Sequence, residues 1–121
     1  MARNAAAYLA DLVESVEAVG AYTKKGKGAF LRSTMARDAV VARIIRIGEA
    51  VKGAQSAGMN LEAMAPEVPW AQVAGMRDIL SHQYWRTDPA IVWAVVEKDL
   101  APLEAAARRI LRSTGRPGRK R

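Results

Sequence analysis

Apolar residues near the start of the chain recur at spacings of three and four, which is the pattern of an amphipathic helix. Over residues 4–22 the apolar positions are Leu9, Leu12, Val13, Val16 and Val19. Acidic side chains occupy the other faces of this segment. A stretch rich in lysine and glycine follows at residues 24–28 and predicts a loop.

A second, longer apolar stripe predicts a helix that begins near Ser33 or Thr34, since either residue is a suitable N-cap. Its apolar positions are Val40, Val41, Ile44, Ile45, Ile47 and Val51. We expect this helix to fade near Gly58. Residues 58–69 contain two prolines and predict a connection that holds at most a short helical turn.

Two further helical regions complete the pattern. The third covers about residues 70–84, and the fourth restarts where Thr87 or Asp88 caps a helix with Pro89 in its first turn. The fourth region runs to about Leu111, with a kink or break before Pro102. No segment has the period of a strand. The sequence therefore predicts an all-α fold, an up-and-down bundle of four to five helices formed by residues 1–111.

The fourth region is apolar nearly all round, which is more than one packing face requires. The residues concerned are Ile91, Val92, Trp93, Val95 and Val96. Burial between two neighbouring helices is one explanation. The other is a second apolar face that forms a homodimer, and we favour the homodimer.

Composition excludes several kinds of chemistry. The 121 residues include no Cys, so disulfides, thiolate metal ligands and cysteine nucleophiles are excluded. A single His cannot form a histidine cluster for zinc or copper, and we expect neither a metal nor a cofactor. The longest apolar run, residues 90–96, is far shorter than a membrane span. With no targeting segment visible, we expect a cytoplasmic protein without a membrane partner.

The net charge of +7 is concentrated at the C-terminus. The tail of residues 112–121 holds five cations and no acid, which leaves +2 for residues 1–111. Gly115, Pro117 and Gly118 make this tail a poor helix former. It is either an arm that binds phosphates or a solvated, disordered end.

The densest group of reactive side chains lies in residues 76–85. Arg77, Asp78 and Tyr84 surround the only His, His82. The spacing Arg-x4-His-x-Tyr resembles the signature of HEPN-domain ribonuclease toxins of the HepT type. The resemblance extends to the flanking segments Ile47-Gly48-Glu49-Ala50, Pro69-Trp70, Gly75-Met76, Asp88 and Val92-Trp93. There are three departures: Asp78 stands where Asn is common, Ala42 stands near the usual position of an Arg, and Asp99-Leu100-Ala101-Pro102-Leu103 has one extra residue.

The resemblance implies a HEPN-like bundle that dimerises and holds its site in a cleft at the homodimer interface. It implies a metal-independent endoribonuclease, the toxin of a type VII-like toxin–antitoxin pair, that cleaves mRNA or tRNA. It further implies an MntA-type nucleotidyltransferase antitoxin that neutralises the toxin by AMPylation of Tyr84. The alternative is a non-catalytic HEPN dimer that binds nucleotides or RNA in the same groove.

The residue types suit cleavage of RNA by its own 2′-OH. His82 fits the role of base, since the ordinary pKa of histidine is about 6.5, and Arg77 fits the role of phosphate ligand. Residues 77 and 82 lie about 140° apart on a regular helix. They converge only if the helix loosens near Ser81 or a second subunit completes the site. Asp78 lies four residues before His82, on the same face, where it would fix the imidazole tautomer.

Overall fold

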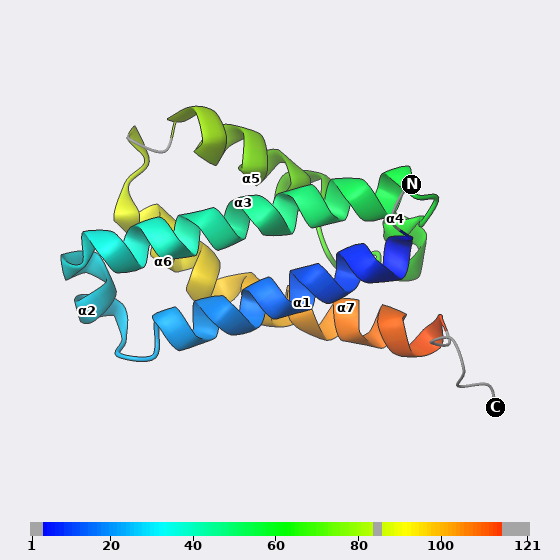
Figure 1. The fold of residues 1–121 in the computed structure, drawn as a ribbon, viewed down its shortest axis with the longest axis horizontal. Helices are drawn as coiled ribbons and strands as arrows, with labels where there is room; N and C mark the ends of the chain where they lie inside the picture. Colours follow the sequence, from blue (N-terminus) through cyan, green and yellow to red (C-terminus); the bar gives the residue numbers. More distant parts are fainter. Residues whose placement is uncertain (1–3, 84–85, 115–121) are drawn as a thin grey trace.

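The computed structural model describes residues 4–83 and 86–114, and this part of the chain is built from helices without a strand (Figure 1). The helices are α1 (Ala5–Tyr22), α2 (Lys27–Arg32), α3 (Thr34–Ser56), α4 (Leu61–Met64), α5 (Trp70–Gln83), α6 (Pro89–Lys98) and α7 (Leu100–Ser113). The predicted all-α bundle is confirmed. None of these helices is both long enough and apolar enough to cross a membrane within the described ranges.

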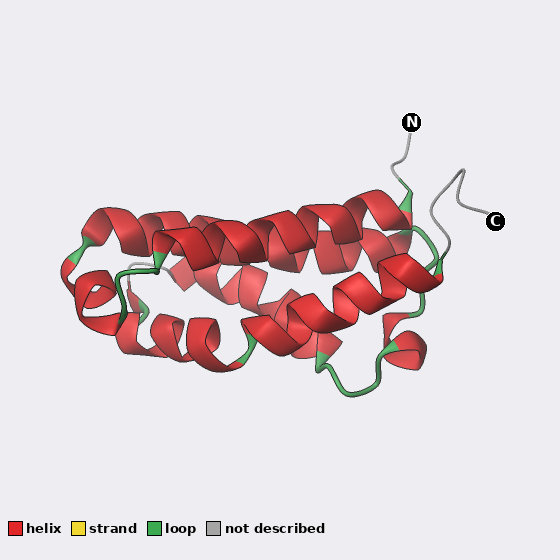
Figure 2. Cartoon of the chain, turned by 90° about the horizontal axis from the view of Figure 1, so that it is seen from below, coloured by secondary structure: helices red, strands yellow, loops and turns green. Residues whose placement is uncertain are grey.

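The two longest helices, α1 and α3, lie side by side and form the centre of the bundle (Figure 1). Helix α7 packs on α1, and α5 packs on the opposite side of the pair, along α3. Figure 2 shows that the described helices are joined by short loops. Side chains cap the N-termini of α1 and α3. Asn4 Oδ1 accepts a hydrogen bond from the N–H of Ala7 at 2.8 Å, and Ser33 Oγ accepts one from the N–H of Ala36 at 3.0 Å.

One apolar core fills the space between these helices. All five apolar positions of the first predicted stripe are buried. Trp70, at the start of α5, is 1% exposed, and its indole N–H donates to the carbonyl of Ala65 at 2.9 Å. This anchor fixes where α5 leaves the preceding loop and therefore where the residues further along α5 lie.

One short helix lies where the sequence predicted a loop, and another is the short helical turn expected in a connection. Helix α2 begins at Lys27, inside the predicted loop of residues 24–28, and α4 lies in the predicted connection of residues 58–69. Segments of six and four residues are too short to show a helical period. The predicted break before Pro102 is present: α6 ends at Lys98, and Pro102 lies in the first turn of α7, where a missing N–H is tolerated. Helix α7 ends two residues beyond the expected Leu111.

Candidate active site

Helix α5 carries three of the four predicted site residues. Arg77, Asp78 and His82 lie on it, whereas Tyr84 lies outside the described residues. The helix continues without a break to Gln83, so it does not loosen near Ser81. Arg77 and His82 therefore stay about 140° apart around the helix axis. Within one subunit they do not converge on a single phosphate.

Arg77 lies on the face of α5 that packs against α3. It lies opposite Gly48, which has no side chain. A Cβ on Gly48 would lie 2.6 Å from the Cβ of Arg77 and 3.3 Å from its main-chain nitrogen. The Nε of Arg77 is buried beside Glu49, 3.6 Å from the carboxylate, with no hydrogen-bond partner. The close helix contact thus fixes the base of the Arg77 side chain.

The carboxylate of Asp78 lies between two cations. Its Oδ1 accepts a hydrogen bond from Arg77 Nη1 at 2.8 Å, and its Oδ2 lies 3.4 Å from Lys52 Nζ. The Arg77 guanidinium and then the Lys52 ammonium lower the pKa of Asp78 below its ordinary value. The same contact raises the pKa of Arg77. Any anion that approaches the guanidinium of Arg77 must therefore compete with the carboxylate of Asp78.

His82 is exposed, and its ring is held by the main chain of its own helix. Its Nδ1 lies 3.1 Å from the carbonyl oxygen of Asp78. A carbonyl only accepts, so this contact selects the tautomer with the proton on Nδ1 and the lone pair on Nε2. That is the form a general base requires. The expected partner was the carboxylate of Asp78, but Arg77 and Lys52 engage that group, and the main-chain oxygen takes its place.

An apolar cavity of about 140 Å³ lies between α3, α5 and α6, and His82 is not among its lining residues. Its lining residues are Ile44, Met76, Ile79, Leu80, Thr87, Ile91, Val92 and Val95. Ile79 precedes His82 by one turn and is 56% exposed, and Ile91 on α6 is 61% exposed. Val92 is the buried residue of α6. The neighbouring described helices therefore bury only part of the apolar surface of α6.

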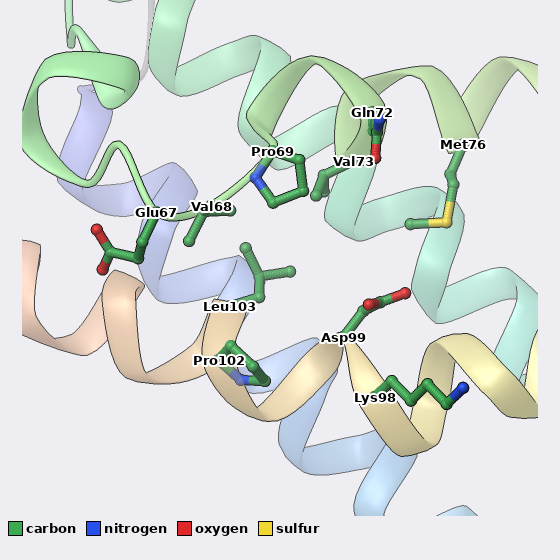
Figure 3. A pocket seen from close by; sticks show the side chains of 10 residues that line it. All are labelled: Glu67, Val68, Pro69, Gln72, Val73, Met76, Lys98, Asp99, Pro102 and Leu103. Carbon is green, nitrogen blue, oxygen red and sulfur yellow. The ribbon is translucent and has the colours of Figure 1, made fainter.

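A second cavity lies on the other side of Met76 and is separate from the predicted site (Figure 3). Its volume is about 320 Å³, and its walls come from the start of α5 and the junction of α6 with α7. Val68, Val73 and Leu103 form its apolar part, with Lys98 and Asp99 at its edge (Figure 3). Neither Arg77 nor His82 lines it.

Sequence reasoning quoted Gly48 and Glu49 without giving either a role. In the structure both contact Arg77. A glycine inside an apolar helical stripe is a signal of close helix packing and was the available clue to Gly48. Lys52, the second cation on Asp78, had no sequence signal because it lies 26 positions away on another helix.

Comparison with known proteins identifies a family of ribonucleases. The family description "Ribonuclease HepT-like" matches residues 12–110. The "Probable ribonuclease HepT" of Thermococcus cleftensis is 31% identical over 105 residues, which cover 86% of this chain and 93% of that protein. "Gamma-glutamylcyclotransferase and putative RNase MJ0434" of Methanocaldococcus jannaschii is 36% identical over 112 residues, covering 92% of this chain.

The chain spans about half the length of that last relative, since the match covers 49% of it. No solved structure gives a significant match. The match to the family description covers most of the chain and includes Arg77, Asp78, His82 and Tyr84, so the resemblance that was inferred from these residues is confirmed. The chain belongs to the HepT-like ribonuclease family.

Proposed function

We propose that the protein is a metal-independent endoribonuclease that cleaves RNA through attack of a 2′-OH on the adjacent phosphate. One observation carries the proposal: on the helix that holds Arg77, His82 is exposed, with Nδ1 engaged by the Asp78 carbonyl and Nε2 open to a substrate. Membership of a ribonuclease family supports RNA as the substrate, with mRNA or tRNA as the candidates.

The proposed step is a proton transfer coupled to displacement at phosphorus. His82 Nε2 takes the proton of the 2′-OH as the O2′–P bond forms. The P–O5′ bond breaks, and the leaving O5′ takes a proton from an acid. The products are a 2′,3′-cyclic phosphate and a 5′-OH. Arg77 stabilises the charge that develops on the phosphorane oxygens.

We propose that a second copy of the chain completes this site in a homodimer. Arg77 and His82 of one subunit point in different directions from α5, and a single His cannot be base and acid in the same step. A second subunit supplies the other His82 and an Arg77 at a converging angle. Ile79, one turn before His82 on α5, and Ile91 on α6 line one cavity and are both exposed, and this supports an interface there because such a surface gains from burial.

The proposal includes control by a partner. The protein acts in the cytoplasm as the toxin of a type VII-like pair, and an MntA-type nucleotidyltransferase antitoxin transfers AMP to Tyr84. Support comes from the family and from sequence position, because Tyr84 follows His82 by two residues. An AMP phosphate near this point would pair with Arg77, and the adenine would fill space that the substrate needs.

The proposed organisation is one HEPN-like domain, residues 1–111, followed by the basic tail of residues 112–121. The family match to residues 12–110 supports this domain. Arg112, the first residue assigned to the tail, lies within α7. We assign the cations of the tail to phosphate binding.

The test is incubation of purified protein with total RNA in excess chelator, comparing wild type with His82→Ala. The matched control is Gln83→Ala, which removes an exposed side chain next to His82 on the same helix. Cleavage by wild type and Gln83→Ala, lost in His82→Ala, supports the proposal. RNA binding without cleavage in all three proteins would instead establish the non-catalytic HEPN dimer.

A further inference from the structure

Five cations gather where α1 turns into α2 and α3. They are Lys24, Lys25, Lys27, Arg32 and Arg37, and residues 18–37 contain no acid. The net charge of +2 over residues 1–111 conceals this, because acids elsewhere in the domain cancel the cations in the sum. We name these five residues the basic end surface.

The charge of the basic end surface is not compensated, unlike that of other cations in the bundle. Lys52 pairs with Asp78, Arg108 with Glu17 and Glu104, and Arg109 with Glu67. In the described part of the chain, none of the five residues of the basic end surface pairs with a carboxylate. Their charges therefore remain available to an anion from solution.

Helix α2 carries two of these cations, Lys27 and Arg32, and is anchored at both its start and its middle. Gly26 turns the chain with a φ of +93°, and its N–H donates to the carbonyl of Thr23 at 2.9 Å. Phe30 anchors the helix in the core: it is 1% exposed, and its ring centre lies 5.4 Å from that of Trp93. Lys24 and Lys25 also lie near the C-terminus of α1, where cations are favourable. Arg32 likewise lies in the last turn of α2, but the effect does not account for Lys27, which begins that helix.

A cavity of about 430 Å³ opens within this surface. Tyr22, Lys25 and Arg32 are among its lining residues, and Phe30 forms part of its apolar wall. Tyr22 is 41% exposed, so its ring is accessible from solvent. An exposed aromatic ring beside two unpaired cations is the combination with which proteins bind single-stranded nucleic acid, the base stacking and the cations holding phosphates.

We propose that the basic end surface binds the backbone of single-stranded RNA, with one base stacked on Tyr22 and flanking phosphates on Lys25 and Arg32. Helix α2 and the end of α5 that carries His82 lie toward the same end of the bundle (Figure 1). A strand cleaved at His82 extends onto this surface. The inference rests on the proposed function for its substrate, and it assigns a binding site away from the reacting groups.

The test compares Lys25→Ala/Arg32→Ala with Arg46→Ala/Lys98→Ala. Each variant loses two exposed cations that form no ion pair among the described residues, but the control pair lies outside the basic end surface. The probe is a fluorescent single-stranded RNA with 2′-O-methyl groups throughout, which cannot be cleaved by 2′-OH attack. Its affinity is measured by anisotropy over a series of salt concentrations.

Each phosphate contact on a single strand contributes about 0.7 to the slope of log affinity against log salt. The Lys25→Ala/Arg32→Ala variant should lose about 1.4 from this slope, and the control should keep the wild-type slope. Equal slopes in the two variants would overturn the assignment. On cleavable RNA the same variant should show a raised KM with kcat unchanged, because neither residue touches the reacting phosphate.

The stacking contact has its own pair of variants. Tyr22→Leu should weaken binding of the methylated probe by about fivefold or more, whereas Tyr22→Phe should bind like wild type. Equal affinity of Tyr22→Leu and wild type would remove Tyr22 from the site. Binding of the probe by a wild-type protein that cleaves no RNA would contradict the proposed function alone. Cleavage of RNA with no effect of these variants would contradict this inference alone.

Discussion

Gly48 of α3 lies directly against Arg77 of α5, so closely that a Cβ on Gly48 would come within 2.6 Å of the Cβ of Arg77. Carbon atoms that are not bonded do not approach to this distance. The absence of a side chain at position 48 therefore sets the separation of two helices at the point where the Arg77 side chain begins. Because the contact is with the Cβ and main chain of Arg77, a rotamer change cannot relieve it.

Gly48→Ala should push α5 away from α3 and displace Arg77. We expect a loss of stability of about 1–3 kcal/mol, the usual cost of overpacking. We expect a loss of kcat of up to about a hundredfold, since a misplacement of about 1 Å has that effect. The control is Gly75→Ala on α5, where no atom lies within 4 Å of the added Cβ. It should keep full activity and gain about 0.5–1 kcal/mol. Equal activities of the two variants would disprove the packing argument.

Asp78→Asn removes the negative charge that competes with RNA for Arg77. Arg77 and Lys52 lower the pKa of Asp78, so the carboxylate is ionised throughout the neutral range and only substitution removes its charge. We expect the variant to bind RNA roughly two- to fivefold more tightly, the effect of one exposed ion pair. Filter binding at fixed salt measures this. Weaker binding by Asp78→Asn would show that Asp78 helps to hold the substrate.

The same carboxylate gives a pH dependence of stability. Its pKa is lower in the folded chain than its ordinary value of 3.8. Its contribution to stability is therefore fully present well above pH 3.8 and is lost as the pH falls through the lowered folded value. Thermal melts should show Asp78→Asn slightly less stable than wild type near neutrality, with the difference vanishing in acid. A difference in melting temperature between the two proteins that grows as the pH falls would contradict this prediction.

Long periodic segments made most of the fold predictable. The stripe from Leu9 to Val19 is buried as its spacing required, and Ser33 and Asp88 cap the helices that follow them. Helix α2 escaped prediction because it is too short to show a helical period, whereas α4 matches the short helical turn expected in residues 58–69. Each of these two helices has one buried residue that anchors it in the core, Phe30 in α2 and Leu61 in α4.

The candidate site was only partly predictable for a different reason. Arg77, Asp78 and His82 lie close in sequence, so spacing alone places them on one helix. Their partners Gly48, Glu49 and Lys52 come from α3, and no local pattern pairs a residue with one 26 to 29 positions away. His82 contacts the carbonyl rather than the carboxylate of Asp78, because Arg77 and Lys52 already engage the carboxylate. The net charge of residues 1–111 does not reveal the basic end surface, because acids elsewhere in the domain offset its five cations.

Truncation after Thr114 should separate RNA binding from folding. Ser113 Oγ donates to Ile110, and the N–H and Oγ1 of Thr114 donate to Ile110 and Leu111, so these two residues complete α7 and should be kept. Removal of residues 115–121 deletes four cations. We expect an unchanged melting temperature and a salt dependence of RNA affinity that flattens by up to about 2.8. An unaltered slope would exclude the tail from RNA binding.

Tyr84→Phe tests control by the antitoxin. The variant keeps the ring and loses only the oxygen that would accept AMP. We expect it to cleave RNA like wild type, to gain no mass with antitoxin and ATP, and to stay active in their presence. Intact-mass spectrometry and a cleavage assay measure these properties. An AMP adduct on this variant, or on another residue of the wild type, would refute the assignment of Tyr84.

The most direct measurement follows cleavage at one phosphodiester bond of an RNA. A short RNA with a known cleavage site is prepared twice, once unmodified and once with a 2′-O-methyl group at the nucleotide 5′ to the cut, and both are incubated with wild type and His82→Ala in excess EDTA. We predict that only wild type with unmodified RNA gives cleavage, leaving a 2′,3′-cyclic phosphate and a 5′-OH. Cleavage of the methylated RNA at the same bond, or dependence of cleavage on a divalent metal, would contradict attack by the 2′-OH with His82 as the base.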